Sequence, residues 1–154
     1  MTSIDLGCGD NIVNTYFLGV DRRQTKYTNT IAEADNLSCF QTSSITVVFS
    51  RRCIQHVVND TKVFEEINRI LTHDGIAVIE VASIWNALFS KALNHLGIKK
   101  YPYNVFHMYT RKGLKNKLEG AGLKIISLCL ASTNKPPFKN HVAICIKGTP
   151  PSAH

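Results

Sequence analysis

The sequence predicts an α/β fold: a Rossmann-like, doubly wound, mostly parallel sheet of seven strands with an antiparallel strand near the C-terminus. A short apolar run at 3–6 ends in the glycine turn Gly7-Cys8-Gly9, and a second apolar run ends in Asp21. Later apolar runs alternate with segments of helical periodicity. In open α/β sheets, nucleotide-like ligands bind where strands end in such turns.

The residues around the turn favour a cationic nucleoside as ligand. Glycine lets the backbone turn sharply and lets a ligand approach closely, and an acid such as Asp21 can accept hydrogen bonds from both ribose hydroxyls. The dinucleotide fingerprint requires a glycine where Ile12 stands and an acid about 20 residues further on. Here Asp21 comes too early, and Asp5 would repel a pyrophosphate. These differences argue against a nicotinamide dinucleotide.

The remaining elements follow from periodicity and capping residues. The expected strands after the first are 17–21, 30–35, 45–49, 76–82, 123–130 and 141–147. We expect a helix capped by Asn59 or Asp60 and two further helices capped by Ser83 and Thr110. Their apolar stripes lie at Val63–Leu71, Trp85–Leu96 and Leu114–Leu118. The Trp85 stripe is expected to be core, and Gly75 is expected to end the first helix in a left-handed turn. The stretch from Gly9 to Leu18 is too short for a full helix, so it should be a loop or one helical turn.

Length and composition indicate one globular domain over 1–148 with a flexible polar tail at 149–154. The sequence has no apolar run long enough to span a bilayer and no apolar segment typical of a secretory signal. Its five cysteines are scattered and its six histidines lack zinc-site spacing. We therefore expect a cytoplasmic protein without disulfides, metal or membrane contact.

Charge is distributed unevenly along the chain. The net charge of +7 arises because nearly all acids lie in residues 1–80, whereas residues 81–154 contain the single acid Glu119 among many lysines. A basic half would suit an anionic substrate, a nucleic acid included, although a solvated lysine-rich surface is an equally good explanation.

The segment Asp5-Leu6-Gly7-Cys8-Gly9 resembles motif I of class I S-adenosylmethionine (SAM) dependent methyltransferases. The similarity covers most of residues 3–82 and is greatest to a compact, type 11-like branch with a shortened first crossover. It implies SAM as cofactor and methyl transfer to an unidentified acceptor. The cofactor-binding residues that it implies are Asp5, Gly7, Cys8, Gly9, Asp21, Arg22, Asp35, Asn36, Leu37, Ser50 and Arg51.

Within that resemblance Asp5 would hold the methionine end of SAM, Asp21 the ribose and Asp35 the adenine. His56, after the fourth strand, and His107, in an aromatic and basic stretch at 99–109 that would cover the substrate, are the candidate general bases. The Asn/Asp-Pro-Pro-aromatic sequence of adenine-N6 enzymes is missing after the fourth strand. The shortened crossover also leaves an alternative: an inactive module of the same fold that binds RNA or a protein partner.

Overall fold

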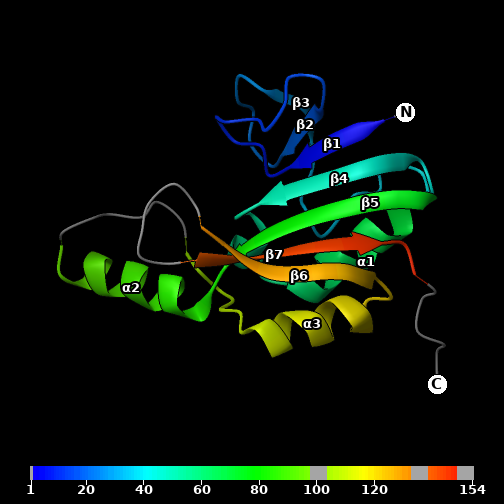
Figure 1. The fold of residues 1–154 in the computed structure, drawn as a ribbon. Coiled ribbons are helices and arrows are strands. Elements are labelled where there is room, and N and C mark those ends of the chain that lie inside the picture. Colours follow the sequence, from blue (N-terminus) through cyan, green and yellow to red (C-terminus); the bar gives the residue numbers. More distant parts are fainter. Residues whose placement is uncertain (1, 98–103, 133–138, 149–154) are drawn as a thin grey trace.

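A computed structural model describes residues 2–97, 104–132 and 139–148, and the expected tail at 149–154 lies outside these residues. One seven-stranded sheet runs through the molecule in the order β3-β2-β1-β4-β5-β7-β6. Strands β1 to β5 are parallel to one another, and β7 pairs antiparallel with both β5 and β6. The predicted fold class is therefore confirmed, including an antiparallel strand inserted between the fifth and sixth strands (Figure 1).

The strands are β1 (Ser3–Leu6), β2 (Leu18–Asp21), β3 (Thr28–Ile31), β4 (Ile45–Arg51), β5 (Leu71–Ala82), β6 (Lys124–Ser132) and β7 (Lys139–Ile146). The connection between β1 and β2 contains turns and no helix, as its length predicts. A short 3-10 helix, η1 (Ile54–His56), follows β4. The carboxyl ends of β1, β2 and β4 lie side by side in the sheet, so the segments that leave them meet at one edge.

The described residues also form three α-helices, and two of them cover the same side of the sheet (Figure 1). The helices are α1 (Asp60–Ile70), α2 (Ile84–His95) and α3 (Arg111–Gly120). Asn59 caps α1 by accepting from the backbone N–H of Lys62, and Thr110 caps α3 by accepting from that of Gly113. No helix of the described residues is long and apolar enough to cross a bilayer.

The core lies between the sheet and the pair α1 and α3. The predicted apolar stripe of α1 is buried completely, as are Leu114 and Leu118 of α3. A buried carboxylate, Asp60, joins the two helices: it accepts from the Tyr109 hydroxyl at 2.8 Å and pairs with Lys117 of α3 at 2.6 Å. Tyr109 precedes α3, so one acid fixes three segments of the chain.

The third strand was predicted too late in the sequence. β3 ends at Ile31, and the backbone turns between Glu33 and Asn36, whose N–H donates to the Glu33 carbonyl at 3.0 Å. The segment 32–35 therefore lies beyond the strand. Asp35 sits in this turn and not at a strand tip.

The predicted glycine turn between α1 and the fifth strand is also wrong. Leu71 adopts an extended conformation immediately after the helix, so the chain continues directly into β5, and Gly75 does not have a positive φ. The carbonyls at the junction of α1 and β5 are satisfied from elsewhere in the chain. Lys147 Nζ donates to those of Arg69 and Leu71, at 3.1 and 2.7 Å, and the Ser43 N–H also donates to that of Arg69. These partners replace a local glycine cap.

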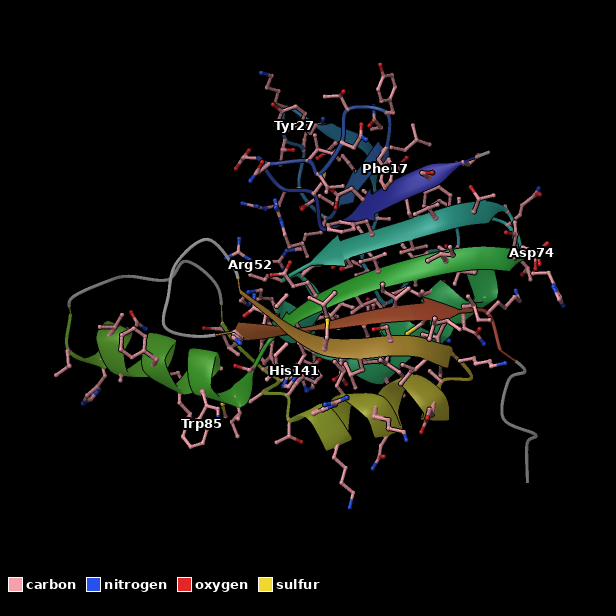
Figure 2. The ribbon with its side chains drawn as sticks, in the orientation of Figure 1. Phe17, Tyr27, Arg52, Asp74, Trp85 and His141 are labelled. Carbon is pink, nitrogen blue, oxygen red and sulfur yellow. The ribbon has the colours of Figure 1, made fainter. Side chains whose placement is uncertain are left out.

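The expectation that Trp85 and its stripe belong to the core is wrong as well. Helix α2 extends away from the sheet beyond the end of β5, and Trp85 is 69% exposed (Figures 1 and 2). Leu96 is 67% exposed at the other end of the helix, whereas Ala87 is buried. Helical periodicity identified the helix correctly, but most of its apolar side chains have no core to enter.

Candidate functional site

A cavity of about 580 Å³ opens at the carboxyl ends of β1, β2 and β4. Leu6, Gly7 and Gly9 form one part of its wall, and Val20 and Asp21 form another. Glu33, Ala34 and Asp35 come from the turn after β3, and Arg52, Cys53 and His56 come from the segment after β4. The position agrees with the rule that open α/β sheets bind ligands where strand order reverses, here between β1 and β4.

The glycine turn is shaped by two positive φ angles. Gly7 has φ +78°, and a Cβ there would lie 2.3 Å from the sulfur of Cys53. Gly9 has φ +51°, and a Cβ there would meet no atom within 4 Å. Gly7 therefore allows close packing of the β1 and β4 segments, whereas the Cα of Gly9 borders open space on the cavity wall.

Asp21 is held in a defined orientation at the end of β2. Its Oδ2 accepts from the Gly9 N–H at 3.0 Å, and its Oδ1 accepts from the Arg23 N–H at 2.9 Å. The residue is 9% exposed and lines the cavity. A carboxylate oxygen has two lone pairs, so each oxygen can accept a further hydrogen bond from a ligand.

The structure places six of the predicted site residues on the cavity wall: Gly7, Gly9, Asp21, Arg22, Asp35 and His56. Seven predicted residues are not part of the wall that the described residues form: Asp5, Cys8, Asn36, Leu37, Ser50, Arg51 and His107. Cys8, Leu37 and Ser50 are buried, Ser50 and Leu37 completely. These three residues pack beneath the site and do not face it.

Asp5 supports the loop between β1 and β2 and does not line the cavity. Its Oδ2 accepts from the Val13 N–H at 2.7 Å, and the residue is 3% exposed. Burial raises the pKa of Asp5, while the hydrogen bond from Val13 and the charge of Arg51 act in the opposite direction. The guanidinium of Arg51 donates to the Asn11 carbonyl at 3.1 Å. Both side chains therefore fix the loop between β1 and β2.

The two candidate bases have different environments. His56 lines the cavity, and its Nδ1 lies 2.8 Å from the Asn104 carbonyl. Because a carbonyl only accepts, Nδ1 carries the proton and the neutral ring has its lone pair on Nε2. His107 instead places Nε2 2.9 Å from the Val58 carbonyl and Nδ1 3.6 Å from Asp60. His107 therefore anchors the segment that precedes α3.

Sequence reasoning missed Arg52, Phe106 and Gln55. Arg52 and Phe106 line the cavity, and the Gln55 carbonyl accepts from the N–H groups of Phe106 and His107. Phe106 lies in the stretch expected to cover the substrate, although 98–103 of that stretch lie outside the described residues. Burial raises the pKa of the Cys53 thiol to about 12, so this cavity residue is neutral near pH 7.

Comparison with known proteins agrees with this geometry. A family model described as a methyltransferase domain matches residues 1–128. A search of curated proteins by sequence gave no significant match. Among solved structures, a methyltransferase of Bacillus halodurans is 14% identical with a TM-score of 0.75, and 96% of this chain and 93% of that chain align.

Two archaeal structures show the same fold. A SAM-dependent methyltransferase of Methanosarcina mazei is 16% identical with a TM-score of 0.74, over 95% of this chain and 92% of that one. A complex between the Haloferax volcanii Trm112 methyltransferase activator and a methyltransferase contains a chain with 14% identity and a TM-score of 0.69, over 96% and 83% of the two chains. On the family match over residues 1–128, this chain belongs to the methyltransferase domain family, and it shares the fold of solved SAM-dependent methyltransferases.

Proposed function

We propose that the cavity binds SAM, with Asp21 accepting from the ribose hydroxyls and Asp35 accepting from the exocyclic amine of adenine. The observation that carries this proposal is the pairing of Asp21 with Gly9. The Gly9 N–H fixes the carboxylate at the cavity wall, and beside it the Gly9 Cα borders open space. The glycine loop would then take the methionine part of SAM.

The residues present fit this cofactor. The cavity volume of about 580 Å³ is within the range of ligand sites of 300–1,000 Å³. Four acids line it: Asp10, Asp21, Glu33 and Asp35. Carboxylates suit a ligand that carries an ammonium and a sulfonium and has no phosphate.

SAM, when bound, supplies a methyl group that is already activated for transfer. The protein's part is therefore to orient the acceptor, to exclude water and to hold the proton that the acceptor loses. Phe106, Val57 and Val58 give the cavity apolar cover. For an acceptor that must lose a proton, His56 is the candidate base, because its imidazole lines the cavity.

We infer that the methyl acceptor is anionic, and that arginines of the first half of the chain recognise it. Arg22 and Arg52 line the cavity and are exposed. Of the described residues after position 80, only Phe106 lines it. Among the described residues, the cations that support an anionic acceptor therefore come from the first half of the chain.

Calorimetric titration of SAM into wild type and Asp21→Asn tests the cofactor site. The amide keeps the size of the side chain but loses the charge and one acceptor, so we expect affinity to fall at least about tenfold. Asp74→Asn is the matched control, because Asp74 is fully exposed at the opposite end of β5 from the cavity (Figure 2). Unchanged affinity in Asp21→Asn would remove Asp21 from the site.

The alternative, an inactive module that binds RNA, predicts different results in binding measurements. Wild type would then give no heat with SAM or S-adenosylhomocysteine. It would bind single-stranded RNA tightly, and affinity would decrease steeply with salt concentration. SAM binding by wild type that is lost in Asp21→Asn would exclude this alternative.

A further inference from the structure

A half-exposed aromatic residue on the cavity wall is held in place by its own backbone. Phe106 precedes α3, and its N–H donates to the Gln55 carbonyl at 2.9 Å. The N–H of His107 donates to the same carbonyl at 3.3 Å, and the Asn104 carbonyl lies 2.8 Å from Nδ1 of His56. The backbone on both sides of Phe106 is therefore attached to the segment that follows β4.

The partners of Phe106 are themselves anchored. Gln55 is 5% exposed, and its side-chain Oε1 accepts from the Ala82 N–H, at the end of β5, at 3.1 Å. The ring of His107 places Nε2 2.9 Å from the Val58 carbonyl. The position of Phe106 is therefore set by contacts that reach back to the sheet, and its ring remains available at the cavity.

Two valines share the cavity wall with Phe106. Val57 and Val58 line the cavity, and Val58 is 72% exposed, while Phe106 is 52% exposed. We call these three residues the apolar wall. Apolar surface that a fixed backbone holds in water gains from being covered by a ligand, because little further ordering is required. The apolar wall is therefore suited to an apolar part of a ligand.

The segment that carries the two valines also brings a cation to the cavity, and no acid. All four acids of the cavity wall come from residues 10–35, which also contribute Arg22 and Arg23. Residues 52–58 contain neither Asp nor Glu, and Arg52 lines the cavity with its side chain exposed. The cavity therefore has an acidic part that suits SAM and a second part that combines an arginine with apolar surface.

We propose that the methyl acceptor is an amphipathic carboxylate, with its carboxylate bound by Arg52 and its aryl or alkyl body packed on the apolar wall. The inference rests on the proposed function, because SAM in the acidic part leaves the second part to the acceptor. Arginine binds a carboxylate through two parallel N–H groups, and aromatic rings pack favourably on one another. Acetate would leave the apolar wall in water, and an amine would be repelled by Arg52.

Binding of three small probes to the wild-type chain saturated with S-adenosylhomocysteine tests the proposal. Phenylacetate carries both groups, acetate lacks the ring, and phenylacetamide lacks the charge. Ligand-observed NMR measures their dissociation constants, and we expect phenylacetate to bind at least about tenfold more tightly than either of the others. A saturated protein that binds none of the three, or that binds acetate or phenylacetamide as tightly as phenylacetate, would overturn the proposal.

Substitution then locates the binding surface. Phe106→Ala should weaken phenylacetate binding at least about fivefold and leave the affinities for acetate and S-adenosylhomocysteine unchanged. Phe89→Ala is the matched control, because Phe89 on α2 is 42% exposed and does not line the cavity. Val58→Ser provides a second variant should Phe106→Ala fail to fold, as judged by circular dichroism. Unchanged phenylacetate affinity in the folded variant would refute the role of the apolar wall.

Calorimetric titration of S-adenosylhomocysteine into wild type separates this inference from the proposed function. A wild type that takes up no S-adenosylhomocysteine would refute the proposed function, and the inference would fall with it. A wild type that takes it up but does not prefer phenylacetate would refute the inference alone.

Discussion

At the scale of single residues, Arg52 combines a strained backbone with an exposed charge on the cavity wall. Its φ is +53°, a conformation that residues other than glycine rarely adopt, and its N–H donates to the Glu80 carbonyl at 2.7 Å. Its guanidinium has no ion-pair partner within the described part of the chain. Such strain is often found at functional sites, and here it accompanies a cation on the cavity wall.

We predict that Arg52→Gln weakens the binding of an anionic acceptor and leaves the binding of SAM unchanged. Loss of a charge-assisted hydrogen bond of about 1.5–3 kcal/mol should raise the KM for acidic acceptors at least about tenfold, with a smaller effect on kcat. The measurement is transfer of a labelled methyl group to a panel of small carboxylates and to the corresponding amides.

Two controls make this result interpretable. Arg111→Gln removes the same charge from the exposed start of α3 and should have no effect on KM. If Arg52 instead served the carboxylate of SAM, Arg52→Gln would lower SAM affinity in a calorimetric titration. A preference for the amides over the carboxylates in wild type would contradict an anionic acceptor.

At the scale of elements, an ion pair on α1 fixes the loop that carries Asp35. Arg69 binds Glu66 through two N–H groups, at 2.8 and 2.9 Å, and also donates to the carbonyls of Leu37 and Phe40. Glu66 in turn accepts from the Leu37 N–H at 2.8 Å. The hydrogen bonds from Arg69 lower the pKa of Glu66. The turn after β3 is thereby attached to a helix of the core.

We predict that Arg69→Lys destabilises the fold and also weakens SAM binding. A lysine keeps the charge, but its three donors sit on one nitrogen and cannot reproduce both bonds to Glu66 together with those to the two carbonyls. We therefore expect a loss of about 1–3 kcal/mol. The control variant is Lys62→Gln, which breaks the ion pair between Lys62 and Glu65 on the same helix. Both of these side chains are about half exposed, so the loss of the pair should cost little stability. Thermal melts measure the stability of both variants, and calorimetric titration measures their affinity for SAM. Equal effects of the two substitutions would show that Arg69 does not support the site.

Elements with strong local patterns could be predicted from the sequence, and elements fixed by distant partners could not. The stripe of α1 and its Asn59 cap, and Thr110 before α3, depend on neighbours within a few residues. The start of β5 depends instead on Lys147, which lies 76 residues beyond Leu71 and satisfies its carbonyl. No local pattern reports such a contact.

The same distinction applies to the site. Asp21 and the glycines could be found because strand ends and turns have a recognisable sequence. The sequence also singled out Asp5, but its carboxylate binds the Val13 N–H and supports the loop. No local pattern reveals that hydrogen bond. Arg52 was missed, because nothing local reveals its positive φ.

At the scale of the whole molecule, the fold should lose stability in acid because of groups in its core. His141 of β7 is 5% exposed, and its Nδ1 has no hydrogen-bond partner among the described residues (labelled in Figure 2). Burial lowers the pKa of His141, against a backbone hydrogen bond with Tyr109 that acts in the other direction. The folded protein therefore keeps this ring neutral at pH values where the unfolded chain protonates it.

At lower pH, two carboxyl groups change the free energy of unfolding in opposite directions. Glu66, whose pKa is lowered, contributes stability that is present above its unfolded pKa of 4.5 and is lost as pH falls through its folded value. Asp5, whose pKa is raised above 3.8, takes up its proton in the folded state first, and this partly offsets the loss from Glu66.

We therefore predict that the free energy of unfolding decreases between pH 7.5 and pH 5.5, in the range around the unfolded histidine value of 6.5. The unfolded state binds the proton there and the folded state does not, so stability falls as pH falls, by at most about 1.4 kcal/mol per pH unit for one proton. Urea titrations at both pH values measure the change. His141→Gln should flatten this dependence, whereas His73→Gln, at a fully exposed position, should leave it as in wild type. A wild-type slope that persists in His141→Gln would place the titrating group elsewhere in the molecule.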